Sequence, residues 1–197
     1  MFWRGRERAS ERPVPVDADS RAVSRARRDP RQFEPLYRKY VAQIYSFALY
    51  ELRDHHAAED LTEEVFLRAL AGLPRFEDRG VAGGSTFRVW LFQICRNLLS
   101  NEHRRERRHP EAPLELAWGL TDGSDPAAVV QLRDEAGRAW SAVARLSPER
   151  RRALVLRFVE EMSAREIGEV LGRSEGAARV LVHRALRAVA ADLRGST

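Results

Sequence analysis

The chain has 197 residues, of which 44% are hydrophobic and 32% are charged, with a formal net charge of +5. That length suits one or two small globular domains, and the basic balance indicates a polyanionic partner. Cys95 is the single cysteine, which excludes an intrachain disulfide and a cysteine-based zinc site. It lies in the apolar run WLFQIC and is expected to be an inert core thiol. The sequence has neither a bilayer-length apolar run nor a signal peptide, so we expect a cytoplasmic protein without membrane insertion.

The beginning of the chain is predicted to be a tail followed by two helices. Residues 1–30 are rich in arginine and contain three prolines, and are expected to form a disordered basic tail. Apolar side chains recur at helical spacing over residues 33–52. A second helix is expected over residues 54–72, and Pro74 prevents its simple continuation.

A glycine-rich loop, EDRGVAGGS at 77–85, precedes a third helix that is predicted over residues 86–108. These three helices are expected to form one module over residues 31–108. Residues 109–125 carry Pro, Gly and Asp and are predicted to be a linker.

The rest of the chain is predicted to form a second module over residues 126–194. Its first helix begins at Asp125-Pro126, and its second begins at Ser147-Pro148, with proline at the first helical position in each case. No strand pattern occurs in the sequence. The predicted fold class is therefore all-α, with two small helical modules joined by a flexible linker.

The last part of the sequence predicts a helix-turn-helix. Ser163 and Glu166 form an S-x-x-E capping box at the start of one helix. Gly172 can adopt the left-handed backbone conformation in which such a helix often ends. Ser174 can cap the following helix, whose N-terminal residues could read base edges in a major groove. The candidate DNA contacts at this helix are Arg173, Ser174, Ala177, Arg179, His183 and Arg184.

The third helix has two contrasting faces. One face carries an apolar stripe that is expected to be core, although Phe87 and Trp90 could instead stack unpaired bases. The opposite face carries amides, which can pair with base edges, and arginines, which can neutralise phosphates. An ordinary solvated face is the alternative. The candidate DNA contacts on this face are Gln93, Asn97, Asn101, Arg104, Arg105 and Arg108.

The helix AEDLTEEVFLRAL at 58–70 is strongly acidic, with only a narrow apolar stripe. Residues 51–70 hold six acids and two arginines, whereas residues 88–108 hold six arginines and two acids. An acidic surface repels DNA, so this helix is expected to face water or a protein partner.

The sequence lacks the motifs of common enzymes and metal sites. The five histidines have no metal-ligand spacing, and there is no phosphate-binding glycine loop, nucleophile elbow or pair of catalytic carboxylates. We therefore expect no enzymatic activity, no cofactor and no metal, and we leave a helical nucleic-acid enzyme as a remote alternative. A stand-alone helix-turn-helix regulator would explain residues 146–194 but not the acidic helix.

Three motifs, taken in order, resemble an extracytoplasmic-function (ECF) sigma factor of bacterial RNA polymerase. FEPLYRKYVAQIYSFAL with AEDLTEEVFLRAL resembles the first helices of sigma region 2, and TFRVWLFQICRNLLSNEHRRERR resembles its promoter-reading helix. LSPERRRALVLRFVEEMSAREIGEVLGRSEGAARVLVHRAL resembles region 4. The resemblance implies a promoter-specificity subunit of core RNA polymerase, with an anti-sigma factor as a further partner.

The resemblance also implies roles for single residues. Asp60, Glu63 and Glu64 would bind the clamp helices of the polymerase β′ subunit. Gln93, Asn97 and Asn101 would read the −10 element, while the loop at 77–85 would hold an extruded base. The helix from Ser174 would read the −35 element, with region 4 docked on the β flap.

The sequence departs from the family pattern at two places. Glu63 stands where the family often has Gln. The recognition helix commonly reads S-E-G-T-V-K-S-R, whereas residues 174–181 read SEGAARVL here. Ala177, Val180 and Leu181 are apolar where that pattern is polar, so fewer side chains remain to specify bases.

Overall fold

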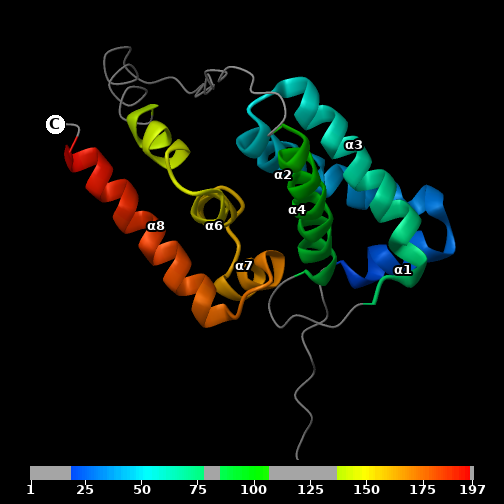
Figure 1. Cartoon of the computed structure of the whole chain (residues 1–197). Coiled ribbons are helices and arrows are strands. Elements are labelled where there is room, and N and C mark those ends of the chain that lie inside the picture. The colour runs from blue at the N-terminus through cyan, green and yellow to red at the C-terminus, as the bar shows by residue number, and fades with distance from the viewer. Residues whose placement is uncertain (1–18, 78–84, 107–136, 196–197) are drawn as a thin grey trace, which may run out of the picture.

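The computed structural model describes residues 19–77, 85–106 and 137–195, and all regular structure in these ranges is helical (Figure 1). Residues 137–144 are helical as well. The all-α prediction is therefore confirmed. In chain order the elements are α1 (Ser20–Arg28), the 3-10 turn η1 (Pro30–Phe33), α2 (Glu34–Leu52), α3 (His55–Gly72), the 3-10 turn η2 (Leu73–Arg75), α4 (Thr86–Glu106), α6 (Pro148–Phe158), α7 (Ala164–Leu171) and α8 (Glu175–Gly195).

Helices α1 to α4 form the N-terminal module around an aromatic core. Tyr40, Phe47, Phe87 and Phe92 are among its largest fully buried side chains. The rings of Phe47 and Phe92 meet edge to face with centroids 5.3 Å apart, which is a favourable geometry for aromatic pairs. Because these rings come from α2 and α4, the core fixes the position of the predicted reading helix.

The prediction of a disordered tail was wrong for the end of that segment, since Ser20–Arg28 form α1. Val23 and Ala26 of α1 are buried. Asp19, just before the helix, accepts hydrogen bonds from Lys39, Tyr40 and Ser85. Burial opposes ionisation of Asp19, but these three donors outweigh it and lower its pKa. Such tertiary anchoring is invisible in a short, arginine-rich sequence.

The helix-turn-helix has the predicted turn chemistry. Ser163 and Glu166 form a complete capping box at the start of α7, and Gly172 ends that helix at φ 68°. The Ser174 hydroxyl accepts a hydrogen bond from the Ala177 amide at 3.2 Å and thereby caps α8. The turn is so tight that a Cβ on Gly168 would lie 2.7 Å from the Arg173 carbonyl oxygen. Glycine at this position therefore sets how closely α8 approaches α7.

The two modules pack against each other. Helix α7 contacts α4, and α6 contacts α2. Figure 1 shows α3 and α7 on opposite sides of α4. Buried side chains of both modules belong to one hydrophobic cluster, which includes Cys95 of α4 and Ile167 of α7. The predicted linker at 109–125 and the start of the helix at Asp125-Pro126 lie outside the described residues.

Over residues 19–77, 85–106 and 137–195, none of the helices combines the length and the apolar character needed to cross a bilayer. In the same ranges, acidic, histidine and cysteine side chains form no group of three or more that could hold a metal ion.

Candidate functional site

The acidic surface predicted for the second helix lies on the exposed side of α3. Asp60 and Glu63 are exposed, whereas Leu61, Val65 and Ala69 of the same helix are buried. Glu64 is half-buried and forms an ion pair with Arg68 at 2.6 Å. The carboxylates of Asp60 and Glu63 are therefore available to a partner.

An apolar groove between α2 and α3 continues this acidic surface. Its volume is about 700 Å³, and its lining includes Tyr37, Glu63 and Leu67. Leu67 is 55% exposed and Tyr37 is 44% exposed, and both line the same groove, so they form part of an exposed apolar patch. A basic, amphipathic helix has the chemistry that would fit an apolar groove with an acidic rim.

The predicted reading face of α4 is only partly open. Asn97 is exposed, and its side-chain oxygen accepts a hydrogen bond from Arg96 at 3.1 Å. Gln93 is half-buried, and its amide donates to the backbone oxygen of Glu169 in α7 at 2.9 Å. The side chains of Asn101, Arg104 and Arg105, and the whole of Arg108, lie outside the described residues.

The two aromatic residues proposed as stacking platforms have separate roles. Phe87 is buried in the core, where its ring lies against Phe33, Tyr40 and Phe76. Trp90 is half-buried and lines a pocket of about 830 Å³ between the end of α3, the beginning of α4 and α7. Only Trp90 could therefore present its ring to a ligand.

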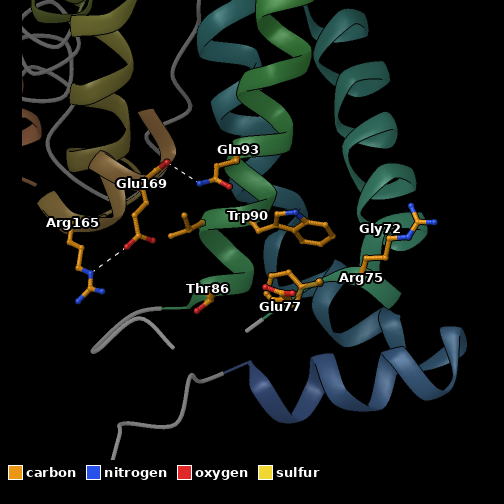
Figure 2. Close-up of a pocket in the computed structure, with 10 residues that line it drawn as sticks. Gly72, Arg75, Glu77, Thr86, Trp90, Gln93, Arg165 and Glu169 are labelled. Atoms are coloured by element: carbon orange, nitrogen blue, oxygen red, sulfur yellow. Dashed lines mark hydrogen bonds and ion pairs between the residues drawn. The ribbon is translucent and has the colours of Figure 1, made fainter. Parts of the chain in front are cut away.

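Figure 2 shows how this pocket is built from both modules. Arg75 and Trp90 come from the N-terminal module, and Arg165 and Glu169 come from α7. Arg165 forms an ion pair with Glu169 at 3.3 Å. The Trp90 ring covers Gly72 so closely that a Cβ there would lie 3.0 Å from the ring. Helix α7 thus closes one side of the pocket, next to Gln93.

The predicted contacts at α8 are all on the surface. Arg173, Ser174, Ala177, Arg179, His183 and Arg184 are exposed. Arg173 forms an ion pair with Glu149 at 2.9 Å, and Arg179 pairs with Glu175 one turn away. Val180 is 49% exposed on the same helix. The buried residues of α8 are Ala178 and Ala185, and the half-buried Val182 and Val189 also pack against the hydrophobic clusters.

The structure also contains an ionic contact between the modules, formed by residues that were not predicted as site residues. The side chain of Glu51 in α2 is fully buried and pairs with Arg152 of α6 at 2.8 Å. Arg151 of the same helix lies 3.6 Å from the carboxylate. The signal was present in the sequence, because Glu51 continues the buried stripe of Ile44 and Ala48 at helical spacing.

A second ionic contact joins α4 to the turn between α6 and α7. Arg88 donates to the backbone oxygen of Glu160 and lies 3.7 Å from the Glu160 carboxylate. Burial raises the pKa of Glu160 to about 7, and the charge of Arg88 only partly opposes this effect. The buried carboxyl of Glu160 also contributes to the raised pKa of Tyr50, about 12, for which burial is the larger cause.

Comparison with known proteins identifies both modules. Residues 36–109 match the family described as sigma-70 region 2, and residues 136–189 match the family described as sigma-70, region 4. RNA polymerase sigma factor YlaC of Bacillus subtilis is 30% identical over 156 residues, which cover 77% of this chain and 86% of that protein. ECF RNA polymerase sigma factor ShbA of Streptomyces griseus is 34% identical over 135 residues, which cover 66% of this chain and 69% of ShbA.

ECF RNA polymerase sigma factor BldN of Streptomyces coelicolor is 32% identical over 160 residues, which are 80% of this chain but 59% of BldN. Two solved structures share the fold. One is the sigma factor RpoE of Bartonella quintana in complex with the anti-sigma factor NepR, with a TM-score of 0.64, 23% identity and coverage of 82% of this chain and 96% of RpoE. The other is CnrH in complex with the cytosolic domain of CnrY, with a TM-score of 0.66 and 24% identity. The match covers 92% of this chain and 100% of CnrH. The chain therefore belongs to the ECF RNA polymerase sigma factors of the sigma-70 family.

Proposed function

We propose that this protein directs core RNA polymerase to a two-part promoter and helps to melt it, without catalytic chemistry of its own. Helix α4 reads the −10 element and α8 reads the −35 element. The observation that carries this proposal is that one chain presents the acidic surface of α3, the polar face of α4 and the exposed recognition helix α8. The protein acts in the cytoplasm, where the polymerase and the promoter are.

The polymerase contact is assigned to the acidic surface of α3 and its neighbouring groove. Asp60, Glu63 and Glu64 would face the clamp helices of the β′ subunit. Support comes from the exposed carboxylates of Asp60 and Glu63, and from the exposed apolar side chain of Leu67 beside them. Charges at the rim guide association, and apolar contacts at the centre provide binding energy. Region 4 would dock on the β flap.

The promoter contacts are divided between the modules. On α4, Gln93 and Asn97 have amides that can pair with base edges, whereas the arginines of both modules suit phosphates. On α8, Ala177 and Val180 are apolar and exposed, so base reading there depends on few polar side chains. Each module alone then has modest selectivity for promoter DNA. Because one chain carries both modules, their selectivities multiply.

The length of the chain allows both elements to be read together. Residues 109–125 can span at most roughly 55–60 Å at about 3.3–3.6 Å per residue. One turn of DNA is about 34 Å, so the modules can reach sites more than one turn apart. Melting of the DNA duplex at the −10 element would involve the loop at 77–85, of which residues 78–84 lie outside the described residues, together with the Trp90 pocket beside it.

An anti-sigma factor is a further proposed partner. One of the solved structures that share the fold is a complex of the sigma factor RpoE with the anti-sigma factor NepR. Such a regulator would compete with polymerase if it covered the groove between α2 and α3.

Transcription with purified components tests the proposed function. Purified chain and core polymerase are incubated with fragments of the source genome, and transcript starts are mapped. We expect starts that share two sequence elements and that need the chain. A chain that binds DNA without capturing core polymerase, and yields no starts, would instead be a stand-alone helix-turn-helix regulator.

A further inference from the structure

Helix α1 carries arginines on the side opposite the core. Its nine residues include four arginines and no acidic residue. Val23 and Ala26 are buried, which fixes the rotation of the helix about its axis. Arg21, Arg25 and Arg28 are exposed, and their i, i+4, i+7 spacing places them on one face, opposite the buried pair. These three residues form an arginine stripe along α1.

The arginine stripe has no acidic counterpart within the described residues. None of its side chains forms an ion pair over residues 19–77, 85–106 and 137–195. Exposed arginines on the next two helices differ, because Arg38 pairs with Glu34 and Arg68 pairs with Glu64, both at 2.6 Å. The carboxylate of Asp29, which follows α1, accepts the Arg31 amide at 3.0 Å. Like charges one turn apart repel each other, so a polyanion would stabilise the stripe.

Two contacts hold α1 next to the end of α3 and the beginning of α4. Arg27 donates to the backbone oxygen of Pro74, just after α3, at 3.0 Å. Asp19, just before α1, is 2% exposed and accepts a hydrogen bond from Ser85, just before α4. The Ser85 hydroxyl in turn accepts the Arg88 amide at 3.0 Å. The cap of the predicted reading helix is therefore tied to α1.

The same ends of α3 and α4 line the Trp90 pocket. Gly72 and Arg75 border it at the end of α3, and Thr86 borders it at the beginning of α4. Figure 1 shows α1 beside these ends of the two helices. A DNA strand held at the pocket would therefore continue within reach of α1.

The length of the arginine stripe suits a phosphate backbone. From Arg21 to Arg28 the helix rises by about 10 Å, at about 1.5 Å per residue. Phosphates of one strand follow each other at about 3.4 Å along a duplex, so the stripe spans about three of them. Arginine can bind a phosphate through two parallel hydrogen bonds, whatever the base sequence. Because α1 is already anchored, little ordering is needed for such binding.

We propose that the arginine stripe of α1 binds phosphates of promoter DNA next to the −10 element, as a contact that does not read bases. The stripe strengthens the hold of the N-terminal module on the strand at the Trp90 pocket and leaves the choice of promoter to α4 and α8. This inference rests on the proposed function for the identity of the DNA. The binding of phosphate by the stripe is a property of the chain itself.

The test measures how DNA affinity depends on salt. The stripe variant combines Arg21→Gln with Arg25→Gln. Binding of a fluorescein-labelled duplex with an unpaired central bubble is measured for the full chain, alone and with core polymerase, over a series of salt concentrations. Each lost phosphate contact should make the slope of log affinity against log salt shallower by about 0.7–0.9. The affinity gap between wild type and the stripe variant should therefore shrink roughly threefold for each doubling of salt.

Matched variants separate phosphate binding from bulk charge and from folding. Arg38→Gln with Arg68→Gln removes the same net charge from arginines that already have acidic partners, and should keep the wild-type slope. Lysine in place of both Arg21 and Arg25 keeps the charge and should also keep the slope. Helical content is checked by circular dichroism. If the stripe variant loses helix, each single substitution is measured instead and should give about half the change in slope.

A second measurement places the contact on the DNA. A promoter found in the transcription experiment is made with neutral methylphosphonate linkages next to the −10 element. These linkages should weaken binding by the wild-type complex and have little further effect on the stripe variant. An equal loss for both proteins would contradict a contact between the stripe and this part of the promoter.

Three results would overturn the proposal. The first is the same slope for the stripe variant and the charge-matched control. The second is a slope that the lysine variant does not restore. The third is a loss of affinity for core polymerase in the stripe variant, which would place an acidic protein surface against α1. A shallower slope in a chain that supports no transcription with core polymerase would contradict the proposed function and leave the phosphate-binding stripe intact.

Discussion

Asn97 is the described amide on α4 that most fully meets solvent. It is exposed, and its side-chain oxygen accepts a hydrogen bond from the adjacent Arg96 at 3.1 Å. An amide in such a position can turn toward a base edge at little cost, because few contacts within the protein must be broken. Gln93 differs, since its amide must first leave the Glu169 backbone oxygen.

Replacement of Asn97 should therefore affect promoter choice and leave polymerase binding intact. Asn97→Ala removes a base contact that is worth about 1–3 kcal/mol of discrimination if it is bidentate. Run-off transcription on templates with altered −10 elements should show reduced discrimination. Ser100→Ala is the control, because Ser100 bonds to the backbone of its own helix at 2.9 Å. An equal loss of affinity for core polymerase would refute this division of labour.

Glu63 provides a second prediction for a single residue. The resemblance places glutamine at this position in many family members, so Glu63→Gln should keep polymerase affinity within a few-fold of wild type. Glu63→Lys reverses the charge beside the groove and should weaken binding at least about tenfold, or about 1.4 kcal/mol. Fluorescence titration with labelled core polymerase measures both. Equal affinity of the two variants for core polymerase would show that Glu63 is not part of the interface.

At the scale of the element, the turn between α7 and α8 requires glycine at a position where a side chain would clash. A Cβ on Gly168 would meet the Arg173 carbonyl oxygen at 2.7 Å, whereas a Cβ on Gly176 would meet no atom within 4 Å. The two glycines lie in neighbouring helices, so they form a matched pair for substitution.

Gly168→Ala should destabilise the protein, because the new methyl group forces α8 away from α7. Gly176→Ala should be neutral or stabilising by up to about 1 kcal/mol, since alanine favours helix more than glycine does. Urea denaturation followed by circular dichroism gives both free energies of unfolding. The prediction for Gly168 is wrong if its variant is as stable as that of Gly176.

Local chemistry explains which elements were predictable. The capping box of Ser163 and Glu166 and the left-handed Gly172 depend on a few neighbouring residues, and both were predicted correctly. Helix α1 was missed because its stability comes from contacts of Asp19 with Lys39 and Ser85, which are remote in sequence. Its own composition, rich in arginine, resembles that of a disordered tail.

At the scale of the whole molecule, the assignment of modules followed from the sequence but their mutual packing did not. Periodicity identifies which face of a helix is apolar, but it does not identify the helix that will cover it. Composition likewise does not identify which acidic side chains will be buried against arginines. In the structure, Glu51 is buried against arginines, whereas Asp60 and Glu63 remain exposed.

The buried carboxyl of Glu160 should make the packing of the modules depend on pH. Its pKa is raised from 4.5 to about 7 when the modules are packed together, mainly by burial. A raised carboxyl pKa favours the packed state at low pH, and this contribution is lost progressively as pH rises from about 4.5 to about 7. The groups that face Glu160 are Arg88, Tyr50 and Cys95. Burial raises the pKa values of Tyr50 and Cys95, so both stay neutral over this range.

Small-angle scattering across this pH range measures the effect. The radius of gyration should grow as pH rises, and Glu160→Gln should flatten the response. The free energy at stake is at most about 3 kcal/mol, from about 1.36 kcal/mol for each pKa unit. Glu161→Gln, at an exposed neighbouring position, should retain the wild-type profile. A radius that shrinks with rising pH would contradict the sign of this linkage.

The bond between Gln93 and the Glu169 backbone has an evolutionary consequence. A mutation at Gln93 that retunes the preferred promoter also changes how firmly the idle protein keeps its modules together. At this position, the set of promoters that is recognised and the strength of packing between the modules therefore cannot evolve independently. Lineages that acquire a new −10 preference through Gln93 should carry compensating changes in α7, where a covariation search across orthologues would find them.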